Sequence, residues 1–185
     1  MEQWKTLEKT VLLDHNKFLR VEQHTIQLPD GKIIERWPWI VSPDFVLVLP
    51  VTDHGTVLLF EQVKYAVQGT SLAPVGGYLE KGEDPLDAAK RELHEEMGCE
   101  AKVWISLGSY PVNGNHGGGT GHLYVATGAS QAGDPIIDDL EEMIMVEMTV
   151  EEAEERMFRG EVKVLGWLAM VAAGLLFLKS NPRRQ

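Results

Sequence analysis

Apolar and polar residues partly alternate along the first third of the chain, a spacing typical of β-strands that bury one face. Two turn-forming stretches, Pro29-Asp30-Gly31 and Asp53-His54-Gly55, interrupt the alternation. The pattern therefore predicts two successive hairpins, the first of which forms an N-terminal extension. The predicted strands span residues 18–28 and 32–41 in the first hairpin, and residues 45–51 and 56–63 in the second.

Helical spacing and capping signals appear further along the chain. Asp84-Pro85 suits an N-cap and first turn, and Gly98 suits a left-handed C-terminal residue, so we expect a helix over residues 85–97. A capping box, Thr149 to Glu152, predicts a second helix that ends at Gly160. Further strands are expected at residues 101–109, 122–127 and 143–148, and a last helix over the apolar run 164–178.

The apolar run at residues 164–178 has the composition of a membrane segment but not its length. It contains 15 residues between Lys163 and Lys179, whereas a membrane-spanning helix needs about 20. We therefore expect a helix in the core or at a subunit contact, and no membrane partner.

The order of these elements predicts the fold class. Strands outnumber helices and the order is mixed, which favours an α/β fold with a mixed central sheet and helices on its faces. At 185 residues the chain is expected to form a single domain. We divide it into an N-terminal β-extension (1–41), a core sandwich (42–180) and a tail (181–185).

Composition and charge narrow the class of protein. The chain is 44% hydrophobic and 24% charged, which is ordinary for a globular domain. A formal net charge of −11 argues against a nucleic-acid partner, because phosphate backbones need basic patches. One cysteine excludes an intrachain disulfide, and the N-terminal residues show no signal-peptide pattern. These features predict a cytoplasmic protein.

The helix expected at residues 85–97 carries an unusual concentration of acids. Glu92, Glu95 and Glu96 are three or four residues apart, or adjacent, so their carboxylates fall on one arc of the helix. Carboxylates this close repel one another unless a cation compensates, and Mg²⁺ or Mn²⁺ suits oxygen ligands. Arg91 is expected to point elsewhere and to hold Glu83 as structural support of the site. The competing interpretation is a solvated acidic helix face.

The spacing of these residues resembles the Nudix box. The box reads Gly, five residues, Glu, seven residues, Arg-Glu-aliphatic, one residue, Glu-Glu, one residue, Gly-aliphatic. Cys99 takes the last aliphatic position as a small hydrophobe. The residues that match are Gly77, Glu83, Arg91, Glu92, Leu93, Glu95, Glu96 and Gly98.

The resemblance to the Nudix hydrolase superfamily implies a fold, a reaction and a metal. The fold is an α/β/α sandwich, and the reaction is hydrolysis of a nucleoside diphosphate linked to another moiety. The implied ligands of Mg²⁺, or of Mn²⁺ in its place, are Glu92, Glu95, Glu96 and the main-chain carbonyl of Gly76. Glu95 and Glu96 are therefore also catalytic candidates.

A wider resemblance extends to the Nudix branch that cleaves ADP-ribose and related nucleoside diphosphate sugars. In that branch a comparable N-terminal β-element packs across a homodimer, which implies a homodimer here. The base that activates water comes there from an acidic loop before a late strand, and residues 138–142 match that loop. We expect Glu141 to be the base or an auxiliary metal ligand, with Asp139 and Glu142 as rivals and a solvated loop as the alternative.

Three residues outside the box are candidates for substrate binding. Arg36 can clamp a phosphate and Trp37 can stack on a base or ribose, against the alternatives of a surface ion pair and of core or interface packing. Lys64 lies in the run Glu61-Gln62-Val63-Lys64-Tyr65, where ADP-ribose enzymes often carry Arg-Gln-Tyr-Arg. The glycine-rich run that follows Pro111 either approaches a ligand or forms a mobile loop.

Taken with the resemblance, these residues predict a Mg²⁺-dependent pyrophosphohydrolase that splits a nucleoside diphosphate sugar into a nucleoside monophosphate and a sugar phosphate. ADP-ribose is the first candidate substrate. Another nucleoside diphosphate derivative, such as GDP-mannose, a dinucleotide or a modified nucleotide, is the alternative. A sensor that binds ADP-ribose without cleaving it is the alternative class, and the complete set of glutamates argues against it.

Overall fold

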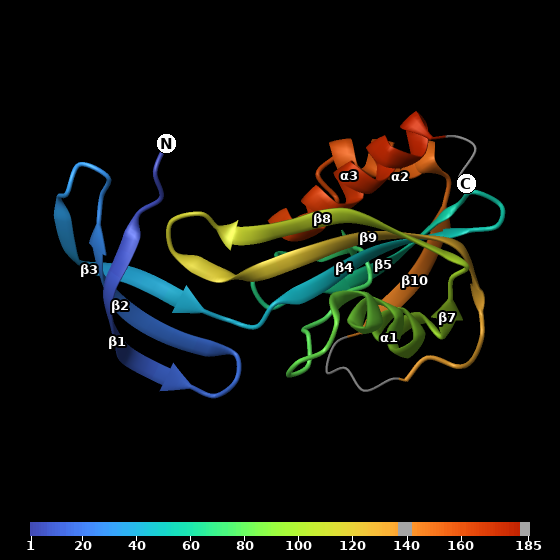
Figure 1. Ribbon diagram of the computed structural model, residues 1–185. Coiled ribbons are helices and arrows are strands. Elements are labelled where there is room, and N and C mark those ends of the chain that lie inside the picture. The colour runs from blue at the N-terminus through green and yellow to red at the C-terminus, as the bar shows by residue number, and fades with distance from the viewer. Residues whose placement is uncertain (137–141, 182–185) are drawn as a thin grey trace. The chain divides into compact units, whose positions relative to one another are not determined.

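The computed structural model describes residues 1–136 and 142–181, and this part of the chain contains ten strands and three helices (Figure 1). In chain order they are β1 (Lys5–His15), β2 (Leu19–Gln27), β3 (Ile33–Val41), β4 (Phe45–Thr52), β5 (Val57–Val63), β6 (Thr70–Ala73), α1 (Pro85–Met97), β7 (Cys99–Glu100), β8 (Val103–Asn113), β9 (Gly117–Gln131), β10 (Met143–Met148), α2 (Val150–Phe158) and α3 (Leu165–Ser180).

The chain forms two compact units. The N-terminal unit comprises Met1–Asp44 with Tyr110–Thr120, and the main unit comprises Phe45–Ser109 with Gly121–Gln185. The division into an extension, a core and a tail within one domain stays a prediction.

The N-terminal unit is a three-stranded antiparallel meander, not only the predicted hairpin. β2 pairs with β3 across the predicted turn, where the Gly31 amide donates to the Leu28 carbonyl (2.9 Å). β1 pairs with the other edge of β2, from Lys5↔Gln27 to His15↔Leu19. The sequence did not reveal β1 because all its residues are exposed, so it lacks the alternation that marks a half-buried strand.

The glycine-rich run belongs to the end of the β8–β9 hairpin and pairs with β3 at Ile40↔Gly117. Gly117 has φ 78°, and a Cβ there would lie 2.8 Å from Cε2 of Trp39. Glycine therefore permits both the left-handed backbone and the close approach to β3. The structure shows neither a ligand contact nor a mobile loop at this run, and Gly117 instead pairs with β3.

Ionisable side chains occupy the buried face of β2. Glu22 and His24 are both buried, and their side chains bond at 2.8 Å, while Arg20 Nε donates to the other Glu22 oxygen at 2.8 Å. The hydrogen bond from His24 lowers the pKa of Glu22; burial opposes this shift and Arg20 reinforces it. Trp39 stacks on His24, with ring centroids 5.2 Å apart.

In the main unit a mixed sheet lies between α1 on one face and α2 and α3 on the other (Figure 1). The strand order is β9-β4-β5-β10, with β4 parallel to β9 from Phe45↔Gly121 to Thr52↔Ala129 and antiparallel to β5. This arrangement confirms the predicted mixed α/β fold. The remaining strands β6, β7 and β8 pair with β5, β9 and β9 respectively.

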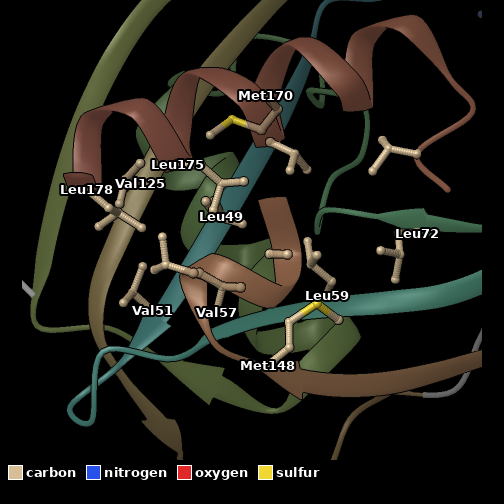
Figure 2. Packing of buried hydrophobic residues seen from close by; sticks show 14 of the residues in the cluster. Leu49, Val51, Val57, Leu59, Leu72, Val125, Met148, Met170, Leu175 and Leu178 are labelled. Carbon is tan, nitrogen blue, oxygen red and sulfur yellow. The ribbon is translucent and has the colours of Figure 1, made fainter. Parts of the chain in front are cut away.

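Alternation along β4 and β5 sends side chains to two separate cores. Leu49 and Leu59 pack with Met170 and Leu175 beneath α2 and α3 (Figure 2). Their sequence neighbours Val48, Leu58 and Phe60 pack instead with α1 residues such as Leu93. The sequences of β4 and β5 are nearly continuous apolar runs because both faces of these strands are covered.

A second antiparallel segment reaches the edge of β4 beyond the β4–β5 turn. β4 and β5 pair at Val51↔Val57, but further along β4 the Val48 and Val46 amides donate to the carbonyls of Val75 (2.8 Å) and Gly77 (2.9 Å). The preceding strand β6 pairs with β5, ending at Phe60↔Ala73. The chain thus passes from β5 to β4 between Ala73 and Val75, which brings residues 75–77 beside β4.

Helix α3 is the buried helix expected from the apolar run. Its buried residues include Met170, Val171, Leu175 and Leu178. Within residues 1–136 and 142–181, no helix is long and apolar enough to cross a membrane.

Adjacent leucines of α3 provide a test of this packing. Leu175 is 2% exposed and Leu176 is 68% exposed. We expect Leu175→Ala to lower the free energy of unfolding by about 2–5 kcal/mol, because it removes buried methyl groups and leaves a cavity. Leu176→Ala, the matched control, should change it by about 0.5 kcal/mol or less. Urea denaturation measures both, and equal losses in the two variants would contradict this placement of α3.

Candidate active site

The acidic helix α1 begins and ends where its capping residues predict. The Asp84 carboxylate accepts a hydrogen bond from the Leu86 amide (2.9 Å), Pro85 opens the helix, and Gly98 ends it with φ 63°. Ala88, Ala89, Leu93 and Met97 are its buried residues. The acidic residues therefore lie on the remaining surface of a helix whose position is set by the core.

The guanidinium of Arg91 is the centre of the site. Its Nε and Nη2 donate to the two oxygens of Glu83 at 2.8 and 3.0 Å, the predicted fork. Nη2 also donates to the Tyr78 carbonyl (3.2 Å). The Glu83 carboxylate in turn accepts a hydrogen bond from the Glu80 amide (2.8 Å). Arg91 therefore ties the loop before α1 to the helix.

Arg91 does not point away from the other acids, contrary to the prediction. Its Nη1 donates to Glu92 Oε1 at 2.8 Å and to Glu95 Oε2 at 2.9 Å. The hydrogen bond from Arg91 lowers the pKa of Glu83, and burial opposes that shift. The pKa of Arg91 itself is raised, first by its hydrogen bond to Glu83, so the guanidinium stays charged.

The Glu92 side chain is more buried than that of Glu95, with 12% of it exposed against 39%. Burial raises the pKa of Glu92; Arg91 lowers it, and the charges of Glu95 and Glu83 raise it. The carboxylate lies against the backbone of Gly77, where any Cβ would overlap it. A side chain at position 77 would therefore force the Glu92 carboxylate out of this position.

Gly76 lies between the two residues that bond to β4. Because Val75 and Gly77 turn their carbonyls toward β4, the Gly76 amide and carbonyl point to the opposite side of this extended segment. The Gly76 amide donates to Glu96 Oε2 at 3.1 Å. The third glutamate is thus held at the backbone position that the resemblance assigned to the metal.

The structure therefore brings together the loop and helix residues of the box, with Gly76 immediately before it. These are Gly76, Gly77, Glu83, Arg91, Glu92, Glu95 and Glu96. Within the described residues, no three Asp, Glu, His or Cys side chains converge as a ready-made metal cluster. Arg91 lies between two of the carboxylates, and its guanidinium provides their counter-charge. The assignment of the metal ligands stays a prediction.

The candidates for the base fall largely beyond the described part of the chain. Glu141 and Asp139 lie outside the described residues. Glu142 is described; it is exposed and immediately precedes β10. The choice among the three stays a prediction.

Two of the candidate substrate residues belong to the N-terminal unit. Arg36 is exposed and has φ 60°, a left-handed conformation that is rare for a residue with a side chain. Trp37 is partly buried: its indole Nε1 donates to the Asn115 carbonyl (2.8 Å), and its ring stacks on His116 at 5.3 Å. Trp37 therefore has a packing role, which was the alternative to stacking on a ligand.

The run that contains Lys64 divides its side chains between the two faces of the main sheet. Glu61 pairs with Arg156 of α2. Gln62 lies on the α1 face, in alternation with Leu58 and Phe60, and its buried Oε1 has no hydrogen-bond partner among residues 1–136 and 142–181. Lys64, partly buried, directly follows the end of β5.

Sequence reasoning named the Gly76 carbonyl but missed two other backbone groups of this site. The Tyr78 carbonyl and the Glu80 amide both bind the Arg91–Glu83 pair. Side-chain identity carries no signal for such contacts, because any residue provides the same backbone groups. Gly77 was recognised only by its place in the box, and its steric role appears in the structure alone.

Two family models match this chain. A NUDIX domain model matches residues 42–168, and a model of the nucleoside diphosphate sugar hydrolase N-terminal domain matches residues 4–40.

Curated relatives and a solved structure agree with these matches. The chain is 30% identical over 148 residues to a methanol dehydrogenase activator of Bacillus methanolicus, covering 78% of each chain. It is 30% identical over 150 residues to an ADP-ribose pyrophosphatase of Bacillus subtilis, covering 80% of each. A crystal structure of an ADP compounds hydrolase superposes with a TM-score of 0.82 at 16% identity, over 99% of this chain and 98% of that one. That likeness shows the fold.

Gly77→Ala tests the packing of Glu92 against the loop. The new methyl group would overlap the Glu92 carboxylate, so this side chain must shift and weaken its hydrogen bond to Arg91, and we expect the free energy of unfolding to fall by about 0.5–1.5 kcal/mol. Gly133→Ala is the control in the same unit, because the nearest atom to its added Cβ is His94 Cε1 at 3.6 Å, an ordinary contact. Urea denaturation compares the variants, and a Gly77→Ala protein as stable as Gly133→Ala would refute the steric role.

Proposed function

The chain belongs to the Nudix family of hydrolases, and on this premise we propose that it is a Mg²⁺-dependent pyrophosphohydrolase of nucleoside diphosphate sugars, with ADP-ribose as first substrate. Water would add to one phosphorus while the bridging P–O bond breaks, giving a nucleoside monophosphate and a sugar phosphate. The observation that carries the proposal is the network in which Arg91 bonds to Glu83, Glu92 and Glu95 and the Gly76 amide bonds to Glu96.

The donor set suits a hard divalent cation. Glu92, Glu95, Glu96 and the Gly76 carbonyl offer only oxygen, which Mg²⁺ prefers, and Mn²⁺ can take the same ligands. The pKa of Glu92 is raised because its negative charge is buried, and a bound cation would offset that charge. A metal bound there would lower the pKa of a coordinated water and offset charge on the phosphate oxygens.

The chain's own residues have two further roles in this proposal. Glu83 and Arg91 brace the loop against α1, which keeps the Gly76 carbonyl and the glutamates on one side of the site. Glu141, outside the described residues, takes the proton of the attacking water, with Asp139 and Glu142 as rivals.

Cationic and aromatic groups outside the box would bind the substrate. Arg36 of the N-terminal unit and Lys64 of the main unit would each bind phosphate oxygens. Because the chain has a net charge of −11, a phosphate substrate needs such local cations to offset the repulsion. Trp37 would offer a nucleotide an aromatic ring, which in the N-terminal unit already stacks on His116 and contacts Trp4 in a T-shaped arrangement with ring centroids 5.6 Å apart. The buried Gln62 Oε1 can accept a hydrogen bond from a substrate hydroxyl.

The names of relatives support the substrate class. An ADP-ribose pyrophosphatase and an ADP-sugar pyrophosphatase of Mus musculus are among them, and the N-terminal model is that of nucleoside diphosphate sugar hydrolases. We further propose a cytoplasmic homodimer in which the N-terminal unit contributes to the subunit contact. Exposed apolar side chains on β1, among them Leu7, Val11 and Leu13, support such a contact.

A substrate panel tests the reaction and its metal. We expect phosphate esters to be released from ADP-ribose with Mg²⁺ and not with a chelator, and more slowly from GDP-mannose, a dinucleotide and an oxidised nucleotide. Glu95→Gln and Glu96→Gln should each lower kcat by about 100-fold or more while the fold is kept, because an ion ligand is lost but the buried residues of α1 remain. The exposed Glu100→Gln is the control. Binding of ADP-ribose without turnover of any compound would favour the sensor instead.

The Arg36→Gly variant distinguishes the effect of backbone strain at this position, seen in stability, from the proposed binding of phosphate by the side chain, seen in kcat/KM. Glycine relieves the left-handed conformation but adds freedom to the unfolded chain, so the free energy of unfolding should stay equal or rise by up to about 1 kcal/mol. Loss of a charge-assisted bond to phosphate should lower kcat/KM by about 10–100-fold.

Asn16→Gly is the matched control, because Asn16 is the other described non-glycine residue with positive φ, at 54°. It should leave kcat/KM unchanged. An Arg36→Gly enzyme with full kcat/KM would remove Arg36 from the substrate site.

A further inference from the structure

The two edges of the Arg91 guanidinium do different things. Nε and Nη2 form the fork to Glu83, and Nη2 also reaches the Tyr78 carbonyl. Nη1 takes no part in that fork; it is shared between Glu92 Oε1 at 2.8 Å and Glu95 Oε2 at 2.9 Å. Bracing the loop therefore needs one edge, and the other edge is committed to two of the proposed metal ligands.

A guanidinium at this position opposes a cation in two ways. It carries a permanent positive charge within hydrogen-bond distance of the oxygens that a divalent ion would use. It also holds those oxygens in its own geometry, so an ion gains Glu92 and Glu95 only by weakening two charge-assisted hydrogen bonds. Both effects lower the affinity of the carboxylates for metal.

We propose that Arg91 is a resident counter-cation that lowers the metal affinity of the box, in addition to bracing it. This inference rests on the proposed function, because it takes Glu92 and Glu95 to be metal ligands. On this proposal, removal of Arg91 changes the metal affinity in the opposite direction to removal of a residue that only supports the site. If Arg91 only positioned the glutamates, its removal would weaken metal binding; if it competes with the ion, its removal strengthens binding.

Lys90 provides the control for net charge. It is the neighbouring residue on α1, and its ammonium lies 3.4 Å from Asp87, a contact on the exposed part of the helix. Lys90→Gln therefore removes one positive charge from the same helix without touching the Arg91 contacts.

The experiment is a titration of the full chain with Mn²⁺, in which free Mn²⁺ is followed by electron paramagnetic resonance. We expect Arg91→Gln to bind Mn²⁺ about tenfold more tightly than the wild type, as expected when a unit charge leaves the neighbourhood of a divalent ion in a half-solvated site. Lys90→Gln should stay within about twofold of wild type, because its charge is exposed and screened. Equal or weaker binding by folded Arg91→Gln would overturn the inference.

Arg91→Lys covers the case in which Arg91→Gln does not fold. One ammonium cannot hold both Glu83 and the Glu92–Glu95 pair, so we expect about threefold tighter binding at unchanged formal charge. No gain in this variant would then overturn the inference. A wild-type protein that binds no Mn²⁺ would overturn the proposed metal site itself, whereas a wild type that binds with no gain in either variant would overturn this inference alone.

Discussion

One guanidinium makes the acidic site compatible with a folded protein. Four carboxylates, those of Glu83, Glu92, Glu95 and Glu96, lie on or beside a single short helix, and Arg91 bonds to three of them. Without a cation such a group would repel itself and lose its geometry. The same side chain also fixes the loop before α1, so the charge balance and the shape of the site have one origin.

The main sheet explains why that loop lies where it does. The edge of β4 beyond the β4–β5 turn is taken by residues 75–77, which arrive from β6 after pairing with β5. Their hydrogen bonds to β4 leave the Gly76 backbone facing the other way, toward Glu96. A backbone group is thus positioned by sheet pairing and a carboxylate by helix packing, and they meet because the core sets both elements.

Local signals accounted for the parts of the fold that could be predicted. Helices α1 and α2 have Asp84 and Thr149 as their N-caps, as expected, because a capping hydrogen bond involves residues two or three apart. Strands β1, β6 and β7 were missed, since the first has no buried face and the other two have at most four residues. Pairing between distant segments decides such strands.

The candidate site, like the fold, was predicted in part. The identity of the box residues and the Arg91–Glu83 fork followed from spacing, and the structure shows that fork. The contacts of Arg91 with Glu92 and Glu95 did not follow, because they depend on which way a long side chain turns once the loop is in place. The packing of Glu92 against Gly77 likewise depends on a segment from outside the helix.

The placement of Glu61 bears on how substrate preference can change among such proteins. In the run 61–65 this residue seemed to replace an arginine of the substrate site, yet its carboxylate pairs with Arg156 on the α2 face of the sheet. Gln62 occupies the opposite face. The two neighbouring side chains therefore belong to different faces of the sheet, so a change in the Glu61–Arg156 pair alters contacts on the α2 face and leaves the α1-face contacts of Gln62 in place.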